Sequence, residues 1–144
     1  MKKYPLPSFL SEFKLTEQQY ERWLARKASS LALRDRERFK DNSINREAYK
    51  VNIHNSVERS KGFDEYTGEK LEWGLISTYN NVDSIESGIE YKKKFHLLPT
   101  VDHVSQNGLG EFRICSWRTN DCKNDLSLTE LIAFCKKIIE NNAR

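Results

Sequence analysis

The chain has 144 residues, of which 38% are apolar and 31% are charged. This length suits one domain with a core of its own, and the composition excludes a disordered chain. The three cysteines form no CxxC pair, Pro5 and Pro7 interrupt the start of the chain, and no apolar run approaches the roughly 18 residues of a membrane span. We therefore expect a soluble, cytoplasmic protein with no disulfide framework, no signal peptide and no membrane partner.

The net charge of +3 conceals an asymmetry between the two parts of the chain. Residues 1–60 carry 13 Lys and Arg against 8 Asp and Glu, a balance of +5, whereas residues 61–144 carry 11 against 13, a balance of −2. An excess of cations in one part favours a polyanionic partner such as nucleic acid. A solvated helix face has the same signature, so charge alone leaves both interpretations open.

Residues 1–61 are predicted to be helical and basic. Thr16 and Gln19 are spaced as a capping box, and the apolar residues that follow recur at helical spacing to about Phe39. A second helix is predicted from a cap at Ser43 or Asn45 to about residue 60. The polar side of the first helix carries Arg22, Arg26, Arg34, Arg36 and Arg38, with Lys27 and Lys40 nearby.

Residues 62–144 show a different, mixed pattern. Leu71–Tyr79 is predicted to be strand-like or a short mixed segment, and Asn80–Gly88 is predicted to be a polar loop or short helix. The segments Thr100–Val104 and Phe112–Trp117 have the composition of short strands, and the polar loop between them contains two glycines. This spacing predicts a β-hairpin.

The end of the chain is predicted to be helical again. Asn120–Asn124 is a short polar helix or turn, and Ser127 with Glu130 forms a second capping box. The apolar residues behind this box predict a last helix with a buried face, on which Cys135 is a small core residue. Together these elements predict one α+β domain, mostly helical, built around a small β-hairpin.

The hairpin region carries a motif of polar residues. Asp102 and His103 are adjacent on its first strand, and Asn120 and Lys123 follow the second strand as Asn-x-x-Lys. Over Val101–Asp125 the chain resembles the HNH nuclease family, also known as the ββα-metal or His-Me finger family. The resemblance implies a metal-dependent endonuclease that hydrolyses DNA phosphodiester bonds, with residues 62–144 as the ββα-metal catalytic core and its C-terminal helix.

The resemblance also implies a role for each residue of the motif. His103 is the expected general base, because a neutral imidazole can take a proton from water near neutral pH. Asp102 and Asn120 are the expected ligands of one Mg²⁺ or Mn²⁺ ion, since carboxylate and amide oxygens suit these hard cations. Asp102 is expected on the opposite side of the strand from His103, because neighbouring strand residues point to opposite faces. Lys123, one helical turn after Asn120, is expected to act on the phosphate in catalysis.

The chain differs from the family pattern in two places. The asparagine that steadies the hairpin loop in the family aligns with Glu111, while Asn107 lies in the same loop. The zinc-knuckle cysteines of many members align with residues that are not cysteines, so no structural zinc is expected. These four positions are Asp64, Thr67, Ser116 and Thr119.

Double-stranded DNA is the expected partner. Arg22, Arg26 and Arg34 of the first helix are candidate contacts to the phosphate backbone. Arg113 and Arg118 are either solvated charges or further phosphate contacts. Two alternatives stay open: a nucleic-acid-binding module without catalysis, which the change at the loop asparagine favours, and an HNH nuclease that acts on RNA. The sequence does not distinguish a monomer from a homodimer.

Overall fold

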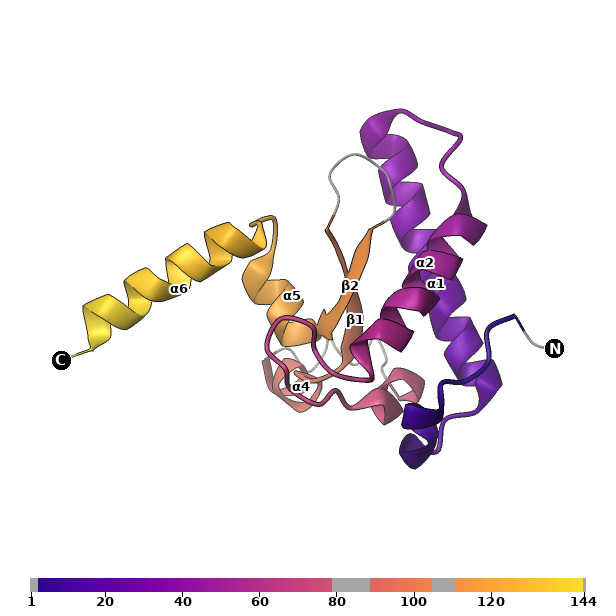
Figure 1. Cartoon of the computed structure of the whole chain (residues 1–144), viewed down its shortest axis with the longest axis horizontal. Helices are drawn as coiled ribbons and strands as arrows, with labels where there is room; N and C mark the ends of the chain where they lie inside the picture. The colour runs from indigo at the N-terminus through magenta and orange to yellow at the C-terminus, as the bar shows by residue number, and fades with distance from the viewer. Residues whose placement is uncertain (1–2, 79–88, 105–110, 144) are drawn as a thin grey trace.

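The computed structural model describes residues 3–78, 89–104 and 111–143. These residues form a mostly helical α+β structure with a two-stranded antiparallel sheet (Figure 1). Within the described ranges, no helix has both the length and the apolar character to cross a membrane. The predicted segment Asn80–Gly88 and Asn107 lie outside the described residues. In chain order the elements are η1 (Ser8–Phe13), α1 (Glu17–Phe39), α2 (Arg46–Ser60), η2 (Trp73–Ser77), α4 (Ile89–Lys94), β1 (Pro99–His103), β2 (Phe112–Ser116), α5 (Trp117–Lys123) and α6 (Leu128–Asn142), where η denotes a 3₁₀-helix.

Helices α1 and α2 begin where the sequence predicts. Thr16 Oγ1 accepts the Gln19 N–H at 3.0 Å and Gln19 Oε1 accepts the Thr16 N–H at 2.9 Å, so the predicted capping box is confirmed. Of the two candidate caps for α2, Asn45 is the one used, because its Oδ1 accepts the Glu47 N–H at 2.7 Å. These caps satisfy backbone donors that a helix leaves free at its start.

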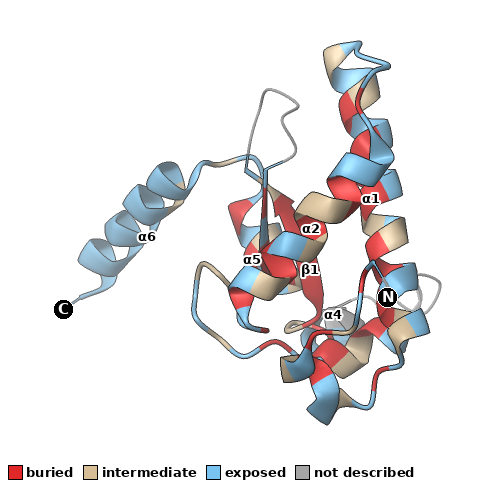
Figure 2. Cartoon of the chain, turned by 45° about the vertical axis from the view of Figure 1, so that its right-hand side comes forward, coloured by how far each residue is buried: buried red, intermediate tan, exposed pale blue. Residues whose placement is uncertain are grey.

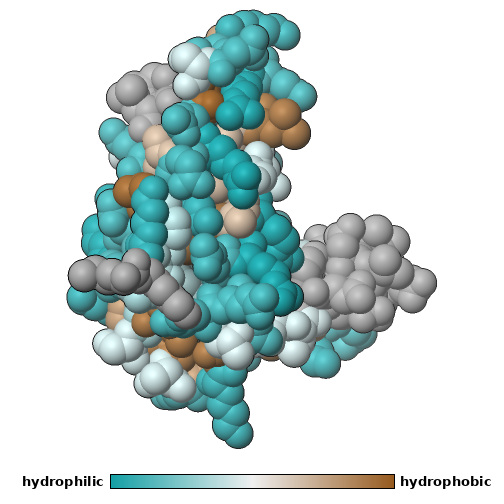
Figure 3. Space-filling model, turned by 90° about the vertical axis from the view of Figure 1, so that its right-hand side faces the viewer, coloured by the Kyte–Doolittle hydropathy of each residue, from teal (hydrophilic) through white to brown (hydrophobic). Residues whose placement is uncertain are grey.

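The core lies where α1, α2, η2 and the sheet meet (Figure 2). Trp23 of α1 meets Trp73 of η2 edge to face, with ring centroids 5.3 Å apart. Leu71 and Trp73 are fully buried, so the segment predicted as strand-like supplies core side chains from around a short 3₁₀-helix instead of a strand. The outer face of the molecule beside α1 and α2 is mostly hydrophilic, with apolar residues scattered over it (Figure 3).

The predicted hairpin is confirmed to within one residue at each strand end. β1 and β2 are antiparallel, and their register places Asp102 opposite Arg113 and His103 opposite Phe112. Most of β1 is buried, including the polar side chains of Thr100 and Asp102. Polar groups at such positions need hydrogen-bond or charge partners, and these partners define the site described below.

Helix α5 begins at Trp117, three residues earlier than the predicted Asn120. Ser116 Oγ accepts the Thr119 N–H at 3.0 Å, and this cap turns the chain from β2 directly into α5. Trp117 was predicted to end the strand, but it is the first residue of α5 and packs half-buried against the core. The capping preference of Ser116 therefore outweighs the strand preference of the tryptophan that follows it.

The predicted buried face of the last helix is wrong. The capping box of Ser127 and Glu130 is present, and α6 forms as expected. However, α6 extends away from the rest of the structure (Figure 1), and its Leu128, Ile132, Ile138 and Ile139 are between 40% and 64% exposed. Cys135, expected in the core, is exposed as well. Helical spacing predicted an apolar stripe correctly, but within the described residues no other element covers it.

Four hydrogen bonds converge on the buried carboxylate of Asp64. Its Oδ1 accepts the N–H groups of Tyr66 at 2.7 Å and Thr67 at 3.0 Å. Its Oδ2 accepts the Ser116 N–H at 2.9 Å and the Thr119 hydroxyl at 2.7 Å. The contacts fix the turn after α2 against the start of α5. They also bring together the four positions that the family resemblance aligns with zinc-knuckle cysteines.

Removal of the Asp64 carboxylate is expected to destabilise the fold. Asp64→Ala leaves the Ser116 N–H and the Thr119 hydroxyl buried without this acceptor, and an orphaned buried donor costs about 1–3 kcal/mol. We expect the free energy of unfolding, measured by urea denaturation, to fall by about 2–5 kcal/mol. Glu69→Ala removes only an exposed ion pair with Arg118 and is expected to cost less than about 1 kcal/mol. Equal, small losses in both variants would show that the Asp64 contacts contribute little.

Candidate functional site

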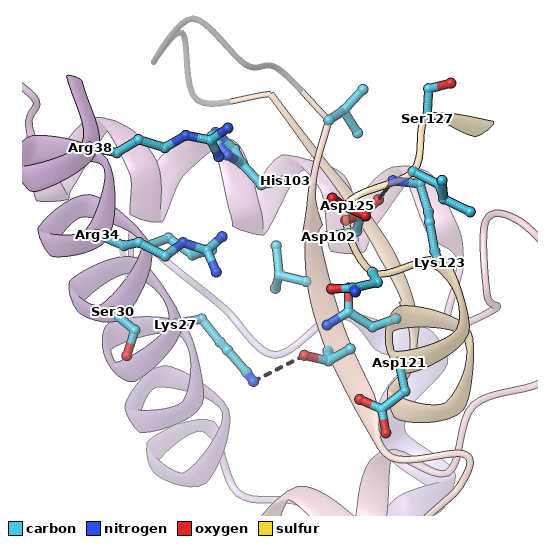
Figure 4. Close-up of a pocket in the computed structure, with 17 residues that line it drawn as sticks. Lys27, Ser30, Arg34, Arg38, Asp102, His103, Asp121, Lys123, Asp125 and Ser127 are labelled. Carbon is cyan, nitrogen blue, oxygen red and sulfur yellow. Dashed lines mark hydrogen bonds and ion pairs between the residues drawn. The ribbon is translucent and has the colours of Figure 1, made fainter. Parts of the chain in front are cut away.

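A cleft of about 720 Å³ lies between α1 and the segment that runs from β1 through α5 to the start of α6. All four residues of the predicted motif line this cleft, so the structure brings them together. Figure 4 shows cationic side chains of α1 on one side and several acidic side chains on the other. The α1 side holds Lys27, Ser30, Leu31, Arg34 and Arg38, and the opposite side includes Asp102, His103, Asn120, Asp121, Lys123 and Asp125.

Asp102 is buried and has two partners on its carboxylate. The Lys123 Nζ of α5 lies 3.0 Å from Asp102 Oδ2, and both side chains are less than a tenth exposed. The Tyr66 hydroxyl donates a short hydrogen bond to the same oxygen. Burial, reinforced by this bond to Asp102, raises the pKa of Tyr66, so the phenol stays protonated and remains a donor. Asp102 is thus held in one orientation at the edge of the cleft.

His103 points to a different partner, as the alternation of side chains along a strand predicts. Its Nε2 lies 3.1 Å from Oδ2 of Asp35, a fully buried residue of α1. Its ring packs against Phe112 with centroids 5.5 Å apart. Burial lowers the pKa of His103, Asp35 opposes this change, and the cationic side chains of Arg34 and Arg38 lower the pKa further. The net direction favours a neutral imidazole, the form that can accept a proton.

Asp35, the partner of His103, is a residue that the sequence prediction missed. A signal for it exists in the sequence, because Asp35 lies four residues after the buried Leu31 and so continues the apolar stripe of α1. A carboxylate at such a position is rarely buried unless it is paired. The sequence does not indicate the partner, because His103 is distant along the chain.

Asp102 and Asn120 offer a carboxylate and an amide oxygen to the same cleft. Within the described residues no three His, Cys, Asp or Glu side chains gather as a ready-made metal cage. Mg²⁺ does not need such a cage, because it keeps several waters and often binds through one or two carboxylates plus a substrate phosphate. The donor chemistry of the two residues therefore fits this ion or Mn²⁺. The Lys123 ammonium would share Asp102 with it.

The five arginines predicted to bind nucleic acid do not share one surface. Arg34 lines the cleft, whereas Arg26 lines a smaller neighbouring pocket and Arg22 lies outside both. Arg118 forms an ion pair with Glu69 at 3.1 Å. Arg113 is exposed and lies over the ring of Tyr66.

Lys27 and Arg38 join Arg34 on the cleft side of α1, although neither was among the predicted contacts. The reason is helical spacing: Arg34 and Arg38 are four residues apart, and Lys27 precedes Arg34 by seven, so the three share one face. Lys27 is partly buried, and its Nζ donates to Thr100 Oγ1 at 3.1 Å. Burial, with a smaller effect of Arg26, lowers the pKa of Lys27 to about 8.

Comparison with known proteins finds no match to this chain among family models, curated proteins or solved structures. A functional assignment therefore depends on the residues and geometry of the cleft.

The lowered pKa of Lys27 predicts a specific pH dependence of stability. Below about pH 8 the ammonium is charged in both the folded and unfolded chain. Between about pH 8 and 10 the folded protein releases this proton while the unfolded chain keeps it, so stability rises with pH. We expect the wild type to gain stability relative to Lys27→Met over this range, measured by urea denaturation at each pH. Parallel stability curves for the two proteins would contradict the assignment.

Proposed function

We propose that this chain is a metal-dependent HNH-type endonuclease that hydrolyses DNA phosphodiester bonds, with β1, β2 and α5 as its ββα-metal core. One observation carries the proposal: Asp102 and His103, adjacent on β1, line the same cleft as Asn120 and Lys123 of α5. Each of these residues taken alone has an ordinary structural explanation. Their convergence on one cleft, beside a row of cationic side chains, supports a site for a phosphodiester.

In the proposed reaction His103 is the general base. Its imidazole takes a proton from a water molecule, and the water oxygen forms a bond to phosphorus. The bond between phosphorus and the 3′ oxygen breaks, and its electron pair stays on the 3′ oxygen. Asp102 and Asn120 would hold Mg²⁺ or Mn²⁺, which supplies Lewis-acid polarisation of the phosphate and positive charge beside the leaving oxygen. Lys123 keeps the Asp102 carboxylate in place and adds positive charge near the phosphate.

The cationic side of α1 is the proposed contact to the phosphate backbone. Arg34 and Arg38 are one helical turn apart, a rise of about 6 Å along the axis. They lie on the cleft side of α1, facing the residues of β1 and α5 (Figure 4). A nucleic acid strand bound along α1 would thus place neighbouring phosphates beside these arginines and direct one of them towards Asp102 and His103.

The second candidate is a nucleic-acid-binding module without catalysis. The observation that favours it is the ion pair of Lys123 with Asp102 Oδ2, because the ammonium neutralises an oxygen that would otherwise bind the metal ion. Glu111 at the position of the family's loop asparagine favours it as well. Both candidates require nucleic acid binding at the cleft, so cleavage is the property that separates them.

Cleavage of supercoiled plasmid is the direct test of the proposed function. Wild-type protein with Mg²⁺ or Mn²⁺ is expected to give nicked or linear product, and EDTA is expected to abolish it. His103→Ala is expected to lower the rate by at least about 100-fold, since general-base catalysis contributes about 10²–10⁴-fold. Asp102→Ala is expected to lose activity and to weaken binding of Mn²⁺.

The outcomes of this assay separate the candidates. Binding of plasmid without product would support the inactive module, and equal cutting by His103→Ala would place the active site elsewhere. A parallel reaction on RNA decides which nucleic acid is the substrate, because a base and a metal ion act on the phosphate in either case.

The salt dependence of binding tests the proposed role of α1. We expect the slope of log K against log salt concentration for a DNA duplex to fall by about two units in Arg34→Ala/Arg38→Ala, because each lost phosphate contact removes about one. The matched control, Arg22→Ala/Arg26→Ala, removes the same charge from α1 outside the cleft. Measurement in a His103→Ala background prevents cleavage. A larger effect of the control pair would assign DNA binding to the part of α1 that carries Arg22 and Arg26.

A further inference from the structure

Asp35 is a buried carboxylate beside His103 that has no role in the reaction proposed above. It is fully buried on α1, and burial of a carboxylate is costly unless hydrogen bonds or charges compensate for the lost water. Among residues 3–78, 89–104 and 111–143, the imidazole of His103 forms an ion pair with it, with Nε2 3.1 Å from Oδ2. A buried carboxylate of this kind depends on its polar neighbours, so the groups that contact it indicate its role.

The contacts of Asp35 fix its orientation towards His103. The Tyr49 hydroxyl of α2 donates to Asp35 Oδ2 at 2.6 Å. His103 Nε2 lies 3.1 Å from the same oxygen. Tyr49 also packs edge to face on Phe112, with centroids 5.1 Å apart, and Phe112 lies against the His103 ring. Residues from α1, α2 and β2 therefore gather at the imidazole of β1.

Two polar atoms in this cluster are left without an ordinary hydrogen bond. His103 Nε2 and Asp35 Oδ1 are both buried, and in the described part of the chain neither has a partner in good hydrogen-bond geometry. Nε2 is within ion-pair distance of Oδ2 but its N–H is not aimed at that oxygen. The carboxylate is thus the nearest acceptor for a proton carried on Nε2.

We propose that Asp35 is a positioning residue for His103: it accepts the Nε2–H, so that Nδ1 is the unprotonated nitrogen that takes the proton from water, and it stabilises the imidazolium that results. This inference rests on the proposed nuclease function for the catalytic part, whereas the tautomer is a property of the resting protein. The physical basis is that a carboxylate on one ring nitrogen fixes the tautomer and orientation of the other.

The tautomer of His103 is the first measurement. In the wild type at a pH where the imidazole is neutral, ¹H–¹⁵N NMR of the ring is expected to show the proton on Nε2. Asp35→Asn is expected to reduce the share of this tautomer, because the neutral amide no longer favours a donor at Nε2. Glu37→Gln, which removes a carboxylate from the exposed side of the same helix, is expected to leave the tautomer unchanged. A wild-type ring protonated on Nδ1 would overturn the proposal, and this result does not depend on whether Asp35→Asn folds.

Cleavage kinetics provide the second measurement. Asp35→Asn is expected to lower kcat by about 10²–10⁴-fold, comparable to the loss of the oriented tautomer in other acid–histidine pairs. KM is expected to change by less than about threefold, since Asp35 does not contact the substrate. Tyr49→Phe removes one hydrogen bond from Oδ2 but keeps the carboxylate beside His103, so it is expected to retain the tautomer and to lower kcat by less than about tenfold.

The two measurements separate failure of this inference from failure of the proposed function. A folded Asp35→Asn protein, judged by its melting curve, with unchanged kcat and unchanged tautomer would overturn the positioning role while the nuclease function stands. A wild type that shows the Nε2–H tautomer but cleaves neither DNA nor RNA would overturn the nuclease function, and with it the catalytic part of this inference, while supporting Asp35 as the residue that fixes the imidazole.

Discussion

Strand β1 carries two adjacent polar residues at buried positions, and most of the site follows from this constraint. A carboxylate or an imidazole removed from water must find a partner, and alternation along the strand sends the two side chains in different directions. Asp102 finds Tyr66 and Lys123, whereas His103 finds Asp35. These contacts join β1 to α1, α5 and the turn after α2. The interactions that hold the structure around β1 are therefore the same ones that orient the candidate catalytic groups.

The features that the sequence predicted well are those that depend on residues close together in the chain. The capping boxes at Thr16 and Ser127 involve residues three positions apart, and both are present. The hairpin also follows from local signals, namely two short apolar segments and a polar loop with glycines. Within the site, His103 and Lys123 were expected to lie close together from their places on a strand and a following helix, and both line the cleft.

The features that were missed depend on contacts between distant parts of the chain. Asp35 continues the apolar stripe of α1, but only the tertiary fold shows that it meets His103. For α6 the sequence predicted a buried face that the structure shows to be exposed. Helical periodicity predicts an amphipathic helix but does not indicate which element, if any, covers its apolar face. Arg22 was predicted as a contact and Arg38 was not, because the sequence shows only that the helix is rich in cations. Which of these cations face the cleft depends on how the helix packs.

The charges of the cleft also link substrate binding to the strength of the base. Arg34 and Arg38 lower the pKa of His103, since a second positive charge nearby disfavours the imidazolium. A phosphate bound beside these arginines would offset their field and raise the pKa of the imidazole again. Burial is the largest cause of the lowered pKa of His103, and the two arginines add to it, so a bound phosphate would remove only their part of the effect. The Asp35 carboxylate acts in the opposite direction from the arginines, because a negative charge 3.1 Å from Nε2 favours the protonated ring.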